Sequence, residues 1–241
     1  MFDHKTGILY IVATPIGNLQ DISIRAIKTL METPFIACED TRRTGILLKE
    51  IGNFYPKLFL DKETRGKRVL ISYYEQNELG RIPQIIDLLK KGNNVALVSD
   101  AGTPAISDPG FKLIRECISQ GIKVESIPGA SSVTSALVVS GLPTDKFLFA
   151  GYPPKKPGNR KRFFLNLKNA REDINFTIII FEAPHKLVKT LIELKEIFGE
   201  TDIVLARELT KVFEEVKRDR LSNLIDYYDT KNPKGEFVIL L

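Results

Sequence analysis

Two carboxylates and two guanidinium groups directly follow a short apolar run, residues 35–38. They are Glu39, Asp40, Arg42 and Arg43. A carboxylate can accept the proton of a reacting hydroxyl group, and a guanidinium can bind a phosphate through two parallel hydrogen bonds. Successive residues of an extended chain point to opposite sides, so we do not expect Glu39 and Asp40 to share one role. The same residues also fit a charged helix start with Asp40 as the N-cap.

Two further polar groups follow apolar runs later in the chain. His185 lies within residues 181–186, where the pattern indicates the first turn of a helix and a histidine is often simply exposed. Lys211 lies within residues 206–211, which also fit a surface segment of ion pairs. For both residues a chemical role and a structural role stay open.

The segment 94–110, NVALVSDAGTPAISDPG, joins a continuous apolar run to a turn of small and polar residues. Such a run is typical of a strand covered on both faces in a parallel sheet, and open α/β sheets bind ligands at the carboxyl ends of their strands. Gly102 would let a ligand approach the backbone closely. Residues 13–18 and 128–132 form similar turns, so three strand ends together favour a ligand crevice.

Other local patterns narrow the class of site. Residues 107–110 favour an ordinary tight turn with Asp108 as N-cap and Pro109 at the first helical position. The chain contains no GxGxxG motif and no GxxxxGK[ST] motif, which argues against a dinucleotide-type Rossmann site and against a P-loop.

Two segments have the composition of a nucleic-acid contact. Residues 73–78, YYEQNE, could stack on a base and hydrogen-bond with it, and they could equally end a surface strand. Residues 152–162, YPPKKPGNRKR, hold five basic residues between Lys155 and Arg162. Their prolines and Gly158 predict an exposed loop, which would either track phosphates or serve as a solvated hinge.

The elements that must position these residues alternate along the chain, which predicts βαβ units and an α/β fold. In the first half we expect strands at 8–13, 35–38, 95–98 and 124–127, with helices over 24–31, 45–49, 84–90, 113–118 and 133–139. Residues 52–70 are expected to be irregular. In the second half we expect strands at 147–150, 177–181, 203–206 and 237–241, with helices near 160–168, 185–198 and 221–228. We place the boundary of the two α/β domains near Ile127, giving domains 1–127 and 128–241.

Composition bounds the class of protein. The 241 residues are 43% hydrophobic and 27% charged, as in globular proteins, and the net charge of +5 is only a weak argument for a nucleic-acid partner. Cys38 and Cys117, the only cysteines, fit buried free thiols of a reducing compartment, and no zinc spacing occurs. The apolar run 8–13 is too short for a signal peptide, and no stretch is long enough to span a membrane, so we expect a cytoplasmic protein.

Seven motifs occur in the order seen in the tetrapyrrole methylase superfamily. They are TPIGNLQDIS at 14–23, EDTRRTGILL at 39–48, SDAGTPAISDPG at 99–110, IPGASS at 127–132, FEAPHK at 181–186, ARELTK at 206–211 and GEFVIL at 235–240. Within that superfamily the chain resembles the ribosomal RNA small subunit methyltransferase I family, which methylates the 2′-hydroxyl of a decoding-centre cytidine in 16S rRNA. The resemblance implies a class III methyltransferase with a ligand cleft between two α/β domains. It also implies S-adenosylmethionine as methyl donor, S-adenosylhomocysteine as product, the small ribosomal subunit as partner, and a homodimer.

The resemblance also implies roles for individual residues. The implied cofactor-binding residues are Ser99, Asp100, Ala101, Gly102, Thr103, Pro104, Ile106, Ser131, Ser132, Phe181, Ala206, Glu208 and Gly235. The candidates for activating the hydroxyl are Glu39, Asp40, His185 and Lys211, which the sequence does not rank. The candidates for holding the RNA are Asn18, Arg42, Arg43, Asn77, Lys155, Lys156 and Arg160.

The chain departs from the family pattern in three places. Many relatives continue beyond the position of Leu241, and the basic segment 155–162 could supply the RNA contact of that extension. Lys186 stands where the family usually has arginine, and residues 52–72 are longer than usual. Two alternative functions remain, a methylase of small tetrapyrroles on the same fold and a ribosome-binding protein without turnover.

Overall fold

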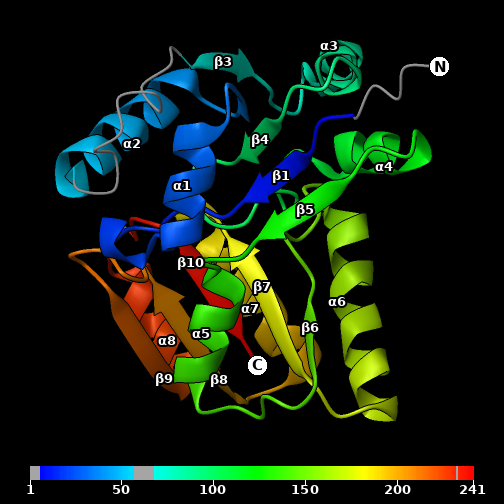
Figure 1. Ribbon diagram of the computed structural model, residues 1–241. Coiled ribbons are helices and arrows are strands. Elements are labelled where there is room, and N and C mark those ends of the chain that lie inside the picture. The colour runs from blue at the N-terminus through cyan, green and yellow to red at the C-terminus, as the bar shows by residue number, and fades with distance from the viewer. Residues whose placement is uncertain (1–5, 57–67, 232) are drawn as a thin grey trace. The chain divides into compact units, whose positions relative to one another are not determined.

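Runs of four mostly apolar residues form the parallel sheet of the first half of the chain. The computed structural model describes residues 6–56, 68–231 and 233–241, and the chain divides between Ser131 and Ser132 into two units. The strands of the first unit, Met1–Ser131, are β1 (Leu9–Val12), β2 (Phe35–Cys38), β3 (Val69–Ser72), β4 (Val95–Val98) and β5 (Val124–Ile127). They are all parallel and lie in the order β3-β2-β4-β1-β5 (Figure 1).

Two helices cover each face of this sheet. Helices α1 (Ile24–Glu32) and α2 (Thr41–Phe54) share one buried cluster with the strands, and α3 (Glu78–Lys90) and α4 (Phe111–Ser119) share another. The connections that leave β1 and β2 therefore run over one face, and the connection that leaves β4 runs over the other. This reversal of connections, between β4 and its neighbours, is where α/β sheets bind ligands.

The second unit, Ser132–Leu241, has a mixed sheet. Its strands are β6 (Phe147–Phe149), β7 (Thr177–Glu182), β8 (Asp202–Arg207), β9 (Glu215–Arg220) and β10 (Phe237–Leu240), in the order β6-β7-β10-β8-β9. Strands β6 and β7 are parallel, and the other neighbours are antiparallel. Helices α6 (Pro157–Asp173), α7 (Leu187–Phe198) and α8 (Leu221–Asp229) pack with the strands into one core. Figure 1 shows α5 (Ser132–Ser140) in front of the strands, with α7 and α8 behind them.

The expected fold class, with two α/β units, is confirmed. Most predicted elements are present, but the irregular segment 52–70 was wrong at both ends, because α2 continues through Phe54 and β3 begins at Val69. Residues 57–67 of that segment lie outside the described residues. Strands β3 and β9 were both missed and both lie at a sheet edge. Strand β9 carries almost no apolar residues, whereas Val69, Leu70 and Ile71 of β3 form a short apolar run that was assigned to the irregular segment.

Two predictions of local structure were wrong. Helix α4 begins at Phe111 with Gly110 as its N-cap, so Asp108 and Pro109 precede the helix rather than starting it. Residues 157–162 are helical, because Pro157 occupies the first turn of α6, where a missing backbone N–H costs nothing. The expected exposed loop therefore ends at Lys156.

Cys38 and Cys117 are free and buried, as predicted. Burial raises the pKa of both thiols, to about 11 for Cys117. Among the described helices, none is long and apolar enough to cross a membrane.

Candidate functional site

The loop that follows β4 is bonded to the loops that follow three other strands. The Thr14 N–H donates to the Gly102 carbonyl at 2.9 Å, and the Gly102 N–H donates back to the Thr14 carbonyl at 3.1 Å. Thr103 Oγ1 donates to the Ala130 carbonyl at 3.1 Å, beyond β5. The Asp40 N–H donates to Asp100 Oδ1 at 3.2 Å, beyond β2. The carboxyl ends of β1, β2, β4 and β5 thus form one connected surface around residues 99–104.

Backbone conformation marks the same loop as unusual. Gly102 has a φ of +80°, and a Cβ atom there would lie 3.3 Å from Ile16 Cγ2. Ala105 and Ser107 also have positive φ values, 68° and 63°, which L-residues with side chains rarely adopt. Strained residues of this kind gather at functional sites, where the surrounding structure holds them in place.

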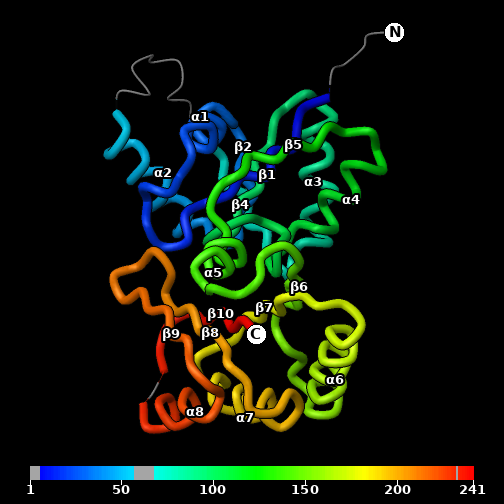
Figure 2. Tube along the Cα trace, turned by 90° about the horizontal axis from the view of Figure 1, so that it is seen from below, coloured from blue at the N-terminus to red at the C-terminus, as the bar shows by residue number. Residues whose placement is uncertain are grey.

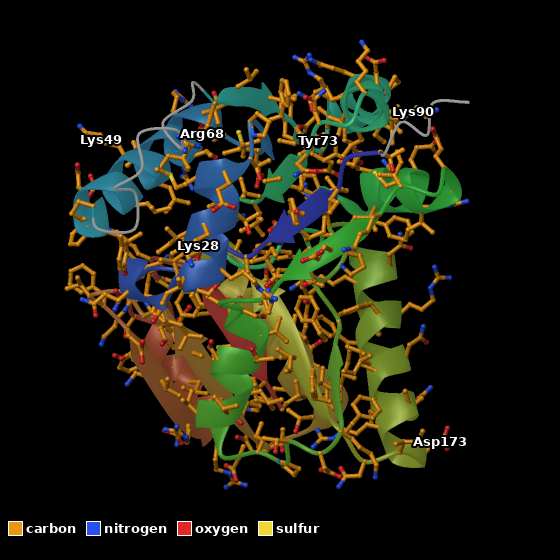
Figure 3. All side chains as sticks on the ribbon, in the orientation of Figure 1. Lys28, Lys49, Arg68, Tyr73, Lys90 and Asp173 are labelled. Carbon is orange, nitrogen blue, oxygen red and sulfur yellow. The ribbon has the colours of Figure 1, made fainter. Side chains whose placement is uncertain are left out.

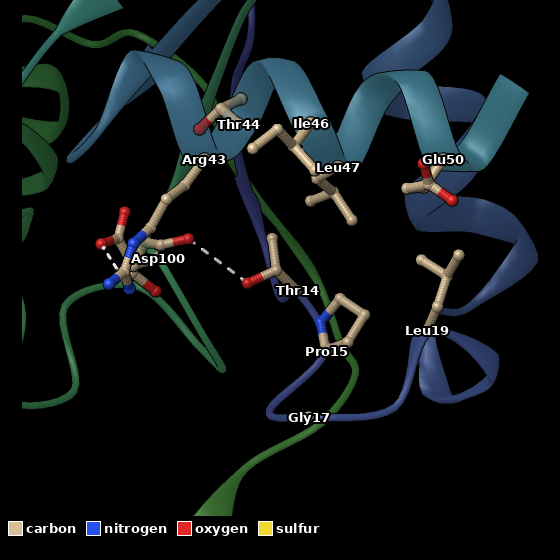
Figure 4. Close-up of a pocket in the computed structure, with 11 residues that line it drawn as sticks. Thr14, Pro15, Gly17, Leu19, Arg43, Thr44, Ile46, Leu47, Glu50 and Asp100 are labelled. Carbon is tan, nitrogen blue, oxygen red and sulfur yellow. Dashed lines mark hydrogen bonds and ion pairs between the residues drawn. The ribbon is translucent and has the colours of Figure 1, made fainter. Parts of the chain in front are cut away.

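A pocket of about 260 Å³ opens beside this loop (Figure 4). Its polar wall contains Thr14, Ser99 and Asp100, and Arg43 Nη1 lies 3.1 Å from Asp100 Oδ2. The remaining lining residues are Pro15, Gly17, Leu19, Thr44, Ile46, Leu47 and Glu50. The pocket therefore lies at the sheet edge and along α2, where the connections reverse.

Sequence reasoning predicted Arg43 of α2 as a site residue but missed the other α2 residues that line this pocket. Thr44, Leu47 and Glu50 recur every three residues and so share one face of the helix. That spacing was the signal that could have identified them.

Asp40 has the structural role that the sequence left open. It is the N-cap of α2, and its Oδ1 accepts the Arg42 N–H at 2.8 Å. Arg42 Nη2 lies 2.9 Å from Asp40 Oδ2. Hydrogen bonds from Arg42 lower the pKa of Asp40 to about 2, which makes this carboxylate a poor proton acceptor.

Glu39 has the opposite electrostatic environment. Burial, and then the negative charge of Asp100, raise the pKa of Glu39 above its usual value, although a hydrogen bond from the Asp100 backbone opposes the shift. A carboxylate with a raised pKa is better matched to accept a proton near neutral pH. Glu39 is thus the better suited of the two adjacent acids.

In the second unit three motifs meet where the strands β7 and β8 end and β10 begins. Phe237, at the start of β10, pairs with Glu182 at the end of β7 and with Arg207 at the end of β8. Segments 181–186, 206–211 and 235–240 are therefore neighbours. The shared edge gathers Phe181, His185, Ala206, Glu208, Lys211 and Gly235.

Charged groups hold this edge together. Glu208 Oε1 accepts hydrogen bonds from Lys211 Nζ at 2.9 Å and from the Glu236 N–H at 3.0 Å, and Lys211 Nζ also lies 3.1 Å from Glu236 Oε2. Gly235 has a φ of +96°, and a Cβ atom there would lie 2.5 Å from Glu208 Cγ. Glu208 and Thr210 both have positive φ values, so this turn is strained as well as charged.

The ion pairs determine the charge state of Lys211. Burial acts to lower its pKa, but hydrogen bonds to Glu208 and Glu236 outweigh burial and raise it. For Glu208, burial acts to raise the pKa, and the contacts with Lys211 and Glu236 lower it. Lys211 therefore remains protonated and cannot readily accept a proton. His185 is exposed on the short 3₁₀ helix Pro184–Lys186.

Arg160 does not lie in an exposed loop, which corrects its predicted role as a phosphate contact. It is 3% exposed, and its guanidinium lies 2.9 Å from Glu182 Oε2 and also donates to Glu193 and Thr190. These partners occupy the groups that would bind phosphate. Lys155 and Lys156 are exposed just before α6.

Tyr73 and Asn77 of the segment 73–78 have structural roles, whereas Tyr74, Glu75 and Gln76 are exposed. Tyr73, labelled in Figure 3, is 1% exposed and its hydroxyl donates to Glu78 Oε2 at 3.2 Å, so its ring cannot stack on a base. Asn77 Oδ1 accepts the Tyr74 N–H at 2.8 Å, and its Nδ2 donates to the Ser72 carbonyl. The Asn77 amide therefore shapes the turn between β3 and α3.

The other predicted residues have varied surroundings. Asn18 is exposed and caps the short 3₁₀ helix Leu19–Asp21, and Arg42 and Arg43 are exposed on α2. Ala101 and Ile106 are exposed, whereas Pro104 and Ala206 are buried. Phe181 packs edge-on against Phe149 and Tyr152, and Ser131 and Ser132 flank the division between the units.

Comparison with known proteins gives a consistent family assignment. The model of the Tetrapyrrole (Corrin/Porphyrin) Methylases matches residues 8–225. A ribosomal RNA small subunit methyltransferase I from Thermotoga maritima is 45% identical over 235 residues, which cover 98% of both chains. The protein of the same name from Synechocystis sp. is 44% identical over 236 residues, which cover 98% of this chain and 78% of the relative.

Solved structures show the same fold at low sequence identity. A diphthine synthase superposes with a TM-score of 0.68 at 20% identity, covering 98% of this chain and 90% of that one. A uroporphyrin-III C-methyltransferase from Thermus thermophilus, complexed with S-adenosylhomocysteine, superposes with a TM-score of 0.60 at 16% identity, covering 97% of both chains.

Proposed function

Because the chain belongs to the ribosomal RNA small subunit methyltransferase I family of tetrapyrrole methylases, we propose that it methylates the 2′-hydroxyl of a cytidine in 16S rRNA, using S-adenosylmethionine. The observation that carries the proposal is the match to named relatives over nearly the whole chain. The proposed reaction is inferred from the family to which the chain belongs. The geometry of the site supports the roles proposed below for individual residues. The proposal includes a homodimer that acts on the small ribosomal subunit in the cytoplasm.

We propose that the strand-end surface of the first unit holds part of the methyl donor. The pocket of about 260 Å³ lies just below the range of about 300–1,000 Å³ that is usual for small-molecule sites. Gly129 approaches Ala13 so closely that a Cβ atom would lie 3.0 Å from Ala13 Cβ, so the two strand-end loops pack tightly there. Backbone groups of residues 99–104, with Ile106 and Ser131, would hold the donor. When bound, S-adenosylmethionine would supply a methyl group that an oxygen nucleophile attacks in line, with S-adenosylhomocysteine as the leaving group.

The second unit contributes the residues that the family resemblance implies. We propose that Phe181, Ala206, Glu208 and Gly235 contact the cofactor together with Ser132. Their meeting at one sheet edge supports this assignment, as does the strained turn at Glu208.

We assign the proton transfer to Glu39. Its raised pKa favours it over Asp40, and the ion pairs of Lys211 disfavour the lysine. Alignment of the reacting groups can contribute about 7–11 kcal/mol, and a general base a further factor of about 10² to 10⁴ in rate. Arg42 and Arg43, exposed at the start of α2, and Lys155 and Lys156 are the proposed phosphate contacts.

The test is transfer of labelled methyl from S-adenosylmethionine to small ribosomal subunits taken from cells that lack this enzyme, followed by nucleoside analysis. We expect 2′-O-methylcytidine. Methylation of a base, or labelling of a precursor corrinoid instead of RNA, would overturn the proposal. Binding of S-adenosylhomocysteine and of subunits without any transfer would indicate the non-catalytic alternative.

A further inference from the structure

Two apolar side chains stand in solvent at the loop that joins β8 to β9. Val212 is 93% exposed and Phe213 is 71% exposed, directly after Lys211. Figure 2 shows this loop, in orange, extending beyond the strands that it connects. Among the described residues, Val212 is the most exposed large apolar side chain and Phe213 is the most exposed phenylalanine.

The backbone of this loop is closed into a defined turn. The Glu214 N–H donates to the Lys211 carbonyl at 3.1 Å, and the Lys211 N–H donates to the Glu208 carbonyl at 3.0 Å. The Glu214 carboxylate accepts the Thr210 N–H, and Leu209 is buried beneath the turn. Val212 and Phe213 are the two central residues of the 211–214 turn, so its closure directs both side chains outward.

The exposed apolar area is small and flanked in sequence by charges. A large aromatic side chain buries about 150–250 Å² at most, whereas a stable protein interface buries about 800 Å² on each partner. Lys211 and Glu214 flank the pair along the chain. These two side chains alone offer far less area than a protein interface needs, and about the area of one nucleobase face.

We propose that Phe213, with Val212 beside it, forms a stacking site for an unpaired base of the RNA substrate. The inference rests on the proposed function, because it takes single-stranded RNA as the ligand. Proteins bind unpaired bases by stacking them on aromatic rings. The turn also follows Glu208 and Lys211 directly, so a base held by Phe213 would lie beside the strained edge of the second unit.

The chain contains no tryptophan, which allows a direct test. In the variant F213W the new indole is the only tryptophan, and stacking on a base quenches its fluorescence. We expect saturable quenching by a hexamer of cytidylate. The control F54W places the sole tryptophan at Phe54, which is 65% exposed at the end of α2, and should show no saturable quenching. Equal behaviour of the two variants would overturn the stacking site.

A kinetic test uses F213A with F54A as its control. We expect F213A to raise KM for small ribosomal subunits about tenfold or more, with kcat and the affinity for S-adenosylhomocysteine unchanged. F54A should match the wild type. An unchanged KM in F213A would overturn the inference. A change in the oligomeric state of F213A, measured by sedimentation, would also overturn it, because it would assign Val212 and Phe213 to a contact with a second copy of the chain. A wild-type enzyme that transfers no methyl to RNA would instead remove the proposed function, and the inference with it.

Discussion

The strand-end loops of the two units are held in different ways. In the first unit, backbone amides, hydroxyls and one guanidinium link the loops around residues 99–104. In the second unit, Glu208, Lys211 and Glu236 form an ion-pair cluster, and Arg160 and Glu182 are paired in the interior. The first arrangement leaves Glu39 with a raised pKa, whereas the ion pairs of the second favour the charged forms of Glu208 and Lys211. The first unit therefore holds its strand-end loops mainly by hydrogen bonds, and the second by ion pairs.

The largest expected effect separates chemistry from stability in the first unit. Replacing Glu39 by Gln should lower the single-turnover rate of methyl transfer by a factor of about 10² to 10⁴, because the proton acceptor is lost. The free energy of unfolding should not fall, because burial disfavours the ionised carboxylate. The wild-type rate should rise with pH as Glu39 loses its proton around its raised pKa. This rise of the rate with pH should be absent in the Gln variant.

The matched control for that rate measurement is Asp40→Asn. The amide can still cap α2, so both the rate and its rise with pH should be close to wild type. A variant at Asp40 as slow as the one at Glu39 would contradict the assignment.

Replacing Arg160 by Met should destabilise the second unit by about 3–5 kcal/mol, because Glu182 would be left as a buried charge without its partner. Urea unfolding followed by circular dichroism measures the loss. The double variant R160M/E182Q removes both charges and should recover part of the stability. A loss below about 1 kcal/mol in R160M would show that the pair is not needed for rigidity.

Replacing Gly102 by Ala should cost about 1–2 kcal/mol, because the residue has a φ of +80°. It should also weaken binding of S-adenosylhomocysteine, since the loop must shift away from Ile16. Gly121 is the matched control, because its φ is +69° and a Cβ atom there meets nothing within 4 Å. G121A should lose a similar amount of stability but keep the wild-type affinity for S-adenosylhomocysteine, measured by calorimetry. If G102A and G121A bind S-adenosylhomocysteine with equal affinity, the ligand does not contact this loop.

The smallest effect concerns the ion pairs of Lys211. K211M should lose about 1 kcal/mol at pH 7, because these groups are only partly buried. The lowered pKa of Glu208 contributes stability above about pH 4.5 that is lost as pH falls, and the raised pKa of Lys211 contributes stability below about pH 10.5 that is lost as pH rises. The difference between wild type and K211M should therefore shrink at both extremes. A difference that stays constant at low pH would contradict the role of Glu208.

Local patterns predicted the interior of the fold better than its edges. Residues 95–98 are all buried in β4, and their unbroken apolar run predicted the strand correctly. The edge strand Glu215–Arg220 buries none of its six residues fully, so the sequence carries no apolar period that could reveal it.

The candidate site was less predictable because its properties depend on distant residues. Glu39 and Asp40 are adjacent, but the charge of Asp100 helps raise the pKa of one while Arg42 lowers that of the other. The sequence placed Arg160 in an exposed basic segment. Its partners Glu182 and Glu193 lie far along the chain, so the local pattern could not show that they pair with its guanidinium. The sequence supplies these groups but does not show which of them meet.

The two buried cysteines have a practical consequence. Both thiols are inaccessible, and their raised pKa leaves little thiolate to react with oxidants or alkylating reagents. A cysteine introduced at an exposed position would therefore be the one reactive thiol of the chain. A fluorophore or spin label can thus be attached at one chosen surface position while Cys38 and Cys117 remain in place.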